Sequence, residues 1–157
     1  MVETTKAYIS GFFDGDGSLF FQLVRRKDYR FGYQIRASAV FYQHKSNKKI
    51  LRWLKHKLRV GYIRDRNDGM SEYTIVGLNE VKKIILLIKP YALLKRNQIN
   101  LALRIIHRIG DNKLSAGQFL RIAKEVDKFK LLNYSKKRTN NYLSVREYFV
   151  DNHLLSL

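Results

Sequence analysis

The sequence contains no cysteine, one proline and few acidic residues. The absence of cysteine excludes a disulfide scaffold, a zinc site built on thiolates and a cysteine nucleophile. A long apolar run is also missing, because charged residues interrupt every candidate before it reaches the length of a membrane span. No targeting peptide is visible, since the N-terminus already has the pattern of a helix start.

The scarcity of acids leaves a large positive charge. The 157 residues include 31 Lys and Arg against 13 Asp and Glu, a formal net charge of +18. The surplus is concentrated in residues 25–66, which contain 14 basic residues and two acids, a local net charge of +12. With 10 Tyr, 9 Phe and 45% hydrophobic residues, the chain is too apolar for a disordered basic tail. A folded domain with this charge is typical of nucleic-acid binding, but charge alone separates neither DNA from RNA nor a binder from an enzyme.

Hydrophobic periodicity and turn residues predict one domain over residues 1–157, of the α+β class. The predicted helices are 4–16, 46–58, 79–88, 91–109, 115–132 and a terminal helix from residue 144. The predicted strands are 18–26, 31–42, 60–66 and 72–76, paired as two hairpins. The predicted helix caps are Thr4 or Thr5, Ser46, Asn79, Ser115 with Gln118, and Ser144 with Glu147. The order of elements is therefore α, β-β, α, β-β, α, α, α, α.

Alternation in the second predicted strand separates two faces. One face carries Ile35, Ala37, Ala39 and Phe41, and the other carries Gln34, Arg36 and Ser38. This pattern is typical of a hairpin with one buried and one solvated face.

The stretch from Ile9 to Gly17 is the most informative part of the chain. Gly11 and Gly15 lie four residues apart and share one helix face, where each costs about 1 kcal/mol of helix stability relative to alanine. Such a pair permits close approach of another helix. Asp16 falls at the helix C-terminus, where the macrodipole is unfavourable to a carboxylate. A nearby cation, such as a divalent metal ion, would compensate for this unfavourable interaction.

Three plainer interpretations compete for these residues. The first is an ordinary acidic turn, and the second is a helix-packing motif with incidental acids. The third, a calcium loop starting at Asp14, fails because its sixth position is Leu19 instead of glycine and its twelfth is Arg25 instead of glutamate. Spacing alone favours the turn.

The stretch Ile9-Ser10-Gly11-Phe12-Phe13-Asp14-Gly15-Asp16-Gly17 resembles the LAGLIDADG motif, with Ile9 and Ser10 where Leu and Ala are usual. From Ile9 to about Lys137 the chain is similar to single-motif LAGLIDADG homing endonucleases of the intron-encoded, homodimeric group. The similarity includes Val60 to Arg66 and Pro90-Tyr91.

The resemblance implies an αββαββα core with extra C-terminal helices and a four-stranded antiparallel sheet per subunit. The sheet would lie in the major groove of a long, roughly palindromic double-stranded DNA target. It also implies a homodimer with Gly11, Phe12 and Gly15 at the interface, inside an organelle or an archaeal or bacterial cell. No membrane partner is expected, and intron RNA stays open as a second partner.

The resemblance further implies metal-dependent hydrolysis of DNA. Asp16, helped by the Gly15 carbonyl, would bind Mg²⁺, with Mn²⁺ able to substitute and Ca²⁺ binding without supporting cleavage. Gln43 and Lys95 match the family's polar and basic active-site residues. Where close relatives carry a further arginine this chain has Asn47, so Lys45, Lys48 or water would take its place. Asp14 faces another side and is expected to have a supporting role.

The candidates for DNA contact are the sheet residues whose side chains alternate onto the solvated face. Arg can pair with guanine and Gln with adenine in the major groove. The predicted DNA-binding residues are Gln22, Arg26, Gln34, Arg36, Ser38, Arg64, Arg66, Glu72, Thr74 and Lys136. The alternatives are an intron RNA maturase, a non-catalytic DNA-binding regulator on the same scaffold, or a structural RNA-binding protein such as a ribosomal component.

Overall fold

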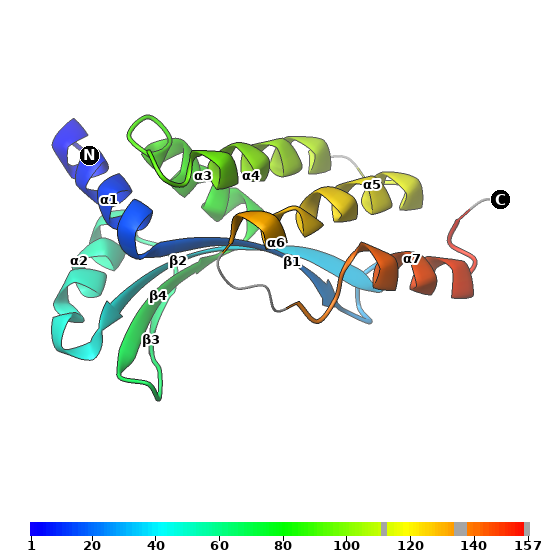
Figure 1. Ribbon diagram of the computed structural model, residues 1–157, viewed down its shortest axis with the longest axis horizontal. Coiled ribbons are helices and arrows are strands. Elements are labelled where there is room, and N and C mark those ends of the chain that lie inside the picture. The colour runs from blue at the N-terminus through cyan, green and yellow to red at the C-terminus, as the bar shows by residue number, and fades with distance from the viewer. Residues whose placement is uncertain (111–112, 134–137, 156–157) are drawn as a thin grey trace. The chain divides into compact units, whose positions relative to one another are not determined.

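The structure, a computed structural model, describes residues 1–110, 113–133 and 138–155 (Figure 1). Its helices are α1 (Glu3–Asp16), α2 (Lys49–Leu58), α3 (Leu78–Ile88), α4 (Arg96–Ile109), α5 (Ala116–Asp127), α6 (Phe129–Leu132) and α7 (Tyr142–Asp151), with a 3-10 turn η1 (Lys45–Asn47). Its strands are β1 (Gly17–Arg25), β2 (Tyr33–His44), β3 (Tyr62–Asp65) and β4 (Met70–Val76). The predicted αββαββα order and the C-terminal helices are confirmed. None of the helices in the described part of the chain is long and apolar enough to cross a membrane.

The four strands form one sheet in the order β1-β2-β4-β3, with β4 antiparallel to both β2 and β3. The turn between β3 and β4 closes through the Arg66 N–H, which donates to the Met70 carbonyl at 2.8 Å, and Gly69 adopts a φ of 82°. That left-handed conformation suits glycine, as the Asn67-Asp68-Gly69 turn predicts.

The chain divides into two compact units, each with its own core. The first comprises residues 1–20 and 37–99, and the second comprises residues 21–36 and 100–157. In the first unit the rings of Phe13, Phe41 and Tyr73 are all fully buried: Phe13 packs edge-on against Phe41 with the centroids 5.0 Å apart, and Phe41 stacks on Tyr73 at 5.8 Å. In the second unit Phe21 stacks on Phe129 at 5.1 Å.

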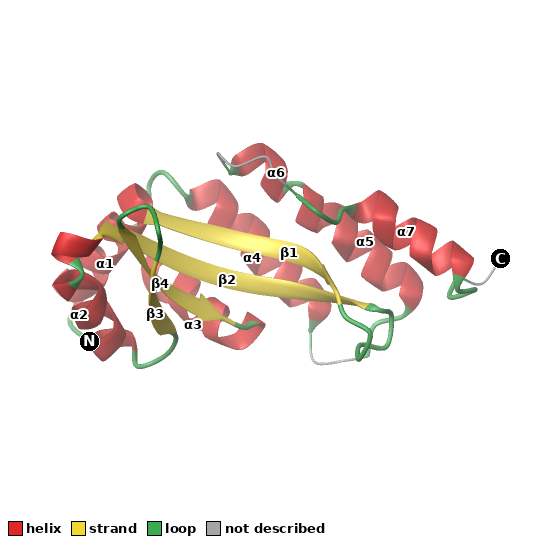
Figure 2. Ribbon diagram, turned by 90° about the horizontal axis from the view of Figure 1, so that it is seen from below, coloured by secondary structure: helices red, strands yellow, loops and turns green. Residues whose placement is uncertain are grey.

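Helices cover one face of the strands in each unit. In the first unit α3 lies over the sheet, and in the second α4 and α5 lie over the β1–β2 hairpin. Figure 2 shows the other face, which carries no helix among the described residues. The buried parity of β2 agrees with the prediction, because Ile35, Ala37, Ala39 and Phe41 are all buried.

Several predicted helix caps are wrong. Helix α1 begins after Val2 without a side-chain cap, and α3 begins after Gly77, which places Asn79 inside the helix. Ser46 lies in η1, where its N–H donates to the His44 ring, and does not cap α2. The box at Ser115 with Gln118 is confirmed.

The C-terminal helices also start and stop differently from the prediction. The terminal box joins Asn141 to Ser144, so the cap lies three residues before the predicted Ser144 and α7 begins at Tyr142. The expected helix 115–132 divides at Lys128 into α5 and α6.

The largest departure is at α4. The sequence predicts a helix from Tyr91, but α4 begins at Arg96, and Leu94 is 75% exposed. The backbone N–H groups of Leu93, Leu94 and Lys95 donate to the Asp14 carboxylate. A contact far away in sequence therefore determines where this helix starts.

Candidate active site

Asp16 ends α1 and is solvent-exposed. The last turn of the helix contains no basic residue, so nothing local offsets the negative end of its dipole. Within the described residues the Asp16 carboxylate makes no hydrogen bond or ion pair. Its oxygens are therefore available to a cation. Gly17 follows directly and turns into β1, in a space where an added Cβ would collide with Phe13.

Lys95 lies beside the end of α1. Its Nζ donates to the Asp14 main-chain oxygen at 2.6 Å. Burial lowers the pKa of Lys95 from the usual lysine value, while the negative charges of Asp14 and Asp16 act in the opposite direction. The structure thus brings two of the three predicted catalytic residues, Asp16 and Lys95, into electrostatic contact.

In the described part of the chain no hydrogen bond joins Gln43 to Asp16 or Lys95. Gln43 lies near the end of β2, opposite Ser71, and its Oε1 accepts a hydrogen bond from the His44 N–H at 2.9 Å. The side-chain amide nitrogen of Gln43 takes no part in this hydrogen bond. The catalytic role of Gln43 stays a prediction.

Sequence reasoning missed an ion-pair network near Gln43. Lys48, one of the proposed substitutes for a basic residue at Asn47, pairs with Asp65 at 2.7 Å. Ser71 Oγ donates to the same carboxylate, also at 2.7 Å. These two hydrogen bonds lower the pKa of Asp65 from its ordinary value. Lys48 therefore already has an ion-pair partner, whereas Lys45 is exposed.

The sheet face of the first unit carries a second network. Arg64 Nη2 lies 2.6 Å from Glu72 Oε1, and Arg66 Nη1 lies 4.0 Å from Glu72 Oε2. Arg66 also pairs with Asp68 at 2.7 Å. Burial, followed by the charge of Glu72, raises the pKa of the neighbouring Tyr42. The two arginines thus share the charge of one carboxylate.

Three predicted DNA-contact residues are not solvent-facing. Ser38, Glu72 and Thr74 are 7%, 8% and 6% exposed, so the expectation of a solvated side chain is wrong at these positions. The cause is cross-strand shielding: Thr74 is paired with Val40 and Tyr62. A DNA contact by these residues would require neighbouring side chains to move.

The predicted DNA-binding residues of the second unit are more accessible. Gln22 is exposed, and Gln34 and Arg36 are half-buried. Arg26 is exposed and makes two hydrogen bonds to Asp28, of 3.0 and 2.9 Å. Lys136 lies outside the described residues.

The two glycines of the motif face open space. An added Cβ at Gly11 or at Gly15 would meet no atom of the described residues within 4 Å. Phe12, which lies between them in sequence, stacks on Phe41 with a centroid distance of 6.0 Å. Part of the Phe12 ring is therefore already in contact with its own chain.

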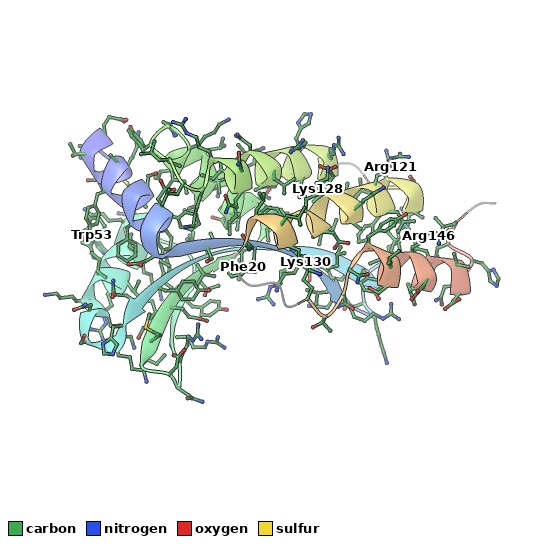
Figure 3. The ribbon with its side chains drawn as sticks, in the orientation of Figure 1. Phe20, Trp53, Arg121, Lys128, Lys130 and Arg146 are labelled. Atoms are coloured by element: carbon green, nitrogen blue, oxygen red, sulfur yellow. The ribbon has the colours of Figure 1, made fainter. Side chains whose placement is uncertain are left out.

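A groove beside α1 continues this open face. It is lined by Thr4, Thr5, Tyr8, Lys49, Ile50 and Trp53. Trp53 of α2, labelled in Figure 3, packs edge-on against Tyr8 of α1 at 5.5 Å. Tyr8 of this groove and Gly11 and Gly15 recur at helical spacing on α1, so they share one helix face.

These features define a class: an α+β domain with a free carboxylate and a half-buried lysine at one helix end, next to an antiparallel sheet rich in arginine. A sequence profile described as LAGLIDADG endonuclease matches residues 9–107. The chain belongs to the LAGLIDADG endonuclease family.

Two curated relatives are similar over most of the chain. DNA endonuclease I-CvuI of Chlorella vulgaris is 38% identical over 141 residues, which are 90% of this chain and 87% of that protein. DNA endonuclease I-CreI of Chlamydomonas reinhardtii is 32% identical over 139 residues, 88% and 85% of the two chains.

Solved structures agree with the fold. I-CvuI in complex with the I-CreI target in the presence of Mg, with the DNA not cleaved, superposes with a TM-score of 0.90 and 34% identity over 98% of both chains. The archaeal intron-encoded homing endonuclease I-Vdi141I, solved with DNA, has a TM-score of 0.83 at 19% identity over 97% of this chain and 98% of that one. The second likeness concerns the fold alone.

Proposed function

We propose that this chain, acting as one domain, is a homing endonuclease that makes a double-strand break in a long, roughly palindromic DNA target. The observation that carries the proposal is the presence of the Lys95 ammonium within electrostatic reach of a free carboxylate, Asp16, at one helix end. Membership of the LAGLIDADG endonuclease family and the similarity to two DNA endonucleases support the same activity.

A divalent metal ion fits the residues at this helix end. Asp16 offers carboxylate oxygens that no other group occupies, and the Gly15 carbonyl belongs to the last, unpaired turn of α1. Oxygen ligands of this kind suit Mg²⁺, and Mn²⁺ should substitute for it. I-CvuI was solved with its DNA target in the presence of Ca, so we expect Ca²⁺ to support binding without cleavage. When bound, the metal lowers the pKa of the attacking water and stabilises charge on the leaving oxygen.

The protein's own groups supply the rest of the chemistry. Asp16 anchors the site at the base of α1, and the Lys95 ammonium places a positive charge where the scissile phosphate gains negative charge. Gln43 would orient water through its free amide nitrogen. The arginines of the sheet hold the backbone phosphates and read base edges.

We further propose that the chain acts as a homodimer joined along α1. Two copies packed at the glycine face would bring their Asp16 carboxylates together and provide one cleavage site for each DNA strand. The open space at Gly11 and Gly15 and the uncovered groove at Tyr8 and Trp53 support this arrangement. A maturase or a regulator without cleavage would leave the Asp16–Lys95 arrangement without a purpose, although an added role on intron RNA stays a prediction.

The test is cleavage of a plasmid that carries the intron-insertion locus, with and without Mg²⁺, by the wild type and by Asp16→Asn. Asn keeps the shape of the side chain and removes its charge. We expect metal-dependent double-strand breaks by the wild type, and binding without cleavage by the variant. Intact plasmid with every divalent metal would overturn the proposal.

A further inference from the structure

Asp14 is a buried carboxylate that the cleavage chemistry does not use. It is 8% exposed, two residues before Asp16. Its Oδ2 accepts from the Leu93 N–H at 2.6 Å and from the Leu94 N–H at 3.2 Å. Its Oδ1 accepts from the Lys95 N–H at 3.1 Å. Three successive N–H groups directed at one carboxylate make a strong, charge-assisted cradle.

The same residue also holds the Lys95 side chain. The Nζ of Lys95 donates to the main-chain oxygen of Asp14 at 2.6 Å. That oxygen lies in the last turn of α1, where carbonyls have no partner within the helix. Asp14 thus binds both ends of Lys95: its carboxylate holds the backbone, and its carbonyl holds the ammonium.

We propose that Asp14 is a positioning residue for Lys95, and that it places the Lys95 ammonium beside Asp16 for DNA cleavage. The expected effect on cleavage rests on the proposed function. The geometry of Asp14 and Lys95 does not depend on any metal or DNA. A flexible lysine side chain would otherwise sample many rotamers, and a displacement of about 1 Å at a reacting centre can cost about a hundredfold in rate.

The alternative is that Asp14 only anchors α1 to the chain before α4. The structure offers a matched control for that role. Ser10, on the same helix and 1% exposed, donates from Oγ to the Ile88 carbonyl at 3.0 Å. This bond also ties α1 to the end of α3, but it does not touch Lys95. Ser10→Ala therefore removes an anchor without moving the ammonium.

The central experiment is a double-mutant cycle on the full-length protein. Single-turnover cleavage of the plasmid carrying the insertion locus is measured for the wild type, Asp14→Asn, Lys95→Ala and the double variant. Asn keeps the size of the side chain but turns amide hydrogens toward backbone N–H groups. We expect Asp14→Asn to lower the cleavage rate about a hundredfold, with the dissociation constant for DNA changed less than about threefold.

The cycle distinguishes positioning from anchoring. If Asp14 acts through Lys95, then Asp14→Asn causes no further loss once Lys95 is alanine. Additive losses, or an unchanged rate in Asp14→Asn, would overturn the inference. Ser10→Ala is expected to lower the melting temperature and leave the cleavage rate within about twofold. If Asp14→Asn does not fold, Asp14→Glu is measured instead, and a wild-type rate in that variant counts against positioning.

A second readout does not depend on cleavage. In the protein without DNA or metal, an amine-reactive reagent labels each lysine at a rate that peptide mass spectrometry follows. We expect Asp14→Asn to raise labelling of Lys95 several-fold while labelling of exposed Lys89 is unchanged. Equal labelling of Lys95 in both proteins contradicts the inference. A wild type that never cleaves DNA but shows the labelling change would overturn the proposed function alone.

Discussion

The guanidinium of Arg25, at the end of β1, lies 3.7 Å from the ring centroid of Tyr148 on α7. The same guanidinium donates through Nη1 to the Gly32 carbonyl at 3.1 Å. A Cβ at Gly32 would collide with both side chains, so the close approach depends on glycine. The tip of the β1–β2 hairpin, which is expected to contact DNA, is therefore held by the C-terminal helix within the same unit.

Replacing Tyr148 should loosen that hairpin. Tyr148→Ala removes the cation–π contact and the packing of the ring on Tyr33, and we expect it to lower the free energy of unfolding by about 1–3 kcal/mol. Tyr148→Phe keeps the ring and should lose much less. Urea unfolding of the three proteins measures the difference, and equal losses in the two variants would show that the ring is not what matters.

Gly11→Leu should disrupt the proposed homodimer without unfolding the chain. An added Cβ at Gly11 meets no atom of the described residues within 4 Å, so we expect the protomer to gain helix propensity of up to about 1 kcal/mol and to keep its fold. The side chain would fill the space needed by a second α1. We expect a monomeric mass at micromolar concentration in light scattering, against a dimer for the wild type.

Gly117 on α5 provides the control for this substitution. An added Cβ there also meets nothing within 4 Å, so Gly117→Leu makes the same chemical change on another helix face. It should leave the mass of the assembly unchanged. A dimeric Gly11→Leu protein would argue against an interface along the glycine face.

Glu72→Gln should strengthen DNA binding and weaken discrimination. The variant releases Arg64 and Arg66 from their shared carboxylate and removes one negative charge per chain. We expect several-fold tighter binding to unrelated duplexes, with a steeper dependence of affinity on salt. Asp28→Asn makes the same change of charge at the exposed Arg26 pair. If both variants alter binding to target and unrelated duplexes equally, position on the sheet is unimportant and only net charge counts.

The acid stability of the second unit should depend on Glu125. This carboxylate is paired with Lys128 at 2.6 Å and with Arg104 and Arg108 at 3.7 and 3.9 Å. The hydrogen bond from Lys128, the largest cause, and the neighbouring charges lower its pKa below the ordinary value, about 4.3 in an unfolded chain. The ion cluster is therefore fully stabilising above that value, and its contribution is lost as the pH falls through the folded pKa.

Glu125→Gln tests this dependence. Urea midpoints measured from pH 7 down to pH 3 should fall less steeply for the variant below about pH 4.3. At pH 7 we expect a loss of about 1–2 kcal/mol, because three cations lose their partner. Glu147→Gln, at an exposed position on α7, should follow the wild-type curve. Parallel curves for wild type and Glu125→Gln would contradict the assignment.

Much of the fold was predictable because it depends on neighbours in sequence. The capping box at Ser115 and Gln118 uses residues three apart, and the buried parity of Ile35 to Phe41 follows from strand geometry alone. The cap of α7 was predicted at Ser144 instead of Asn141, because both positions offer a suitable oxygen and the sequence does not rank them.

The candidate site was predictable only in part. The motif places Asp16 at a helix end, and the resemblance singled out Lys95. That Thr74 and Glu72 are shielded could not be read from alternation, because the shielding side chains belong to neighbouring strands. The Lys48–Asp65 pair likewise joins residues whose proximity depends on how α2 meets the sheet.

By itself the sequence determined the charge, the order of helices and strands, and a helix that ends in a carboxylate and carries two glycines on one face. These features depend on composition and on contacts within a few residues. Only the tertiary structure decided that α4 starts at Arg96 and that Asp14 holds Lys95. The reason is that Asp14 captures N–H groups 79 to 81 residues away, which would otherwise have continued a helix. Such a contact forms only when the chain folds, and no local sequence pattern predicts it.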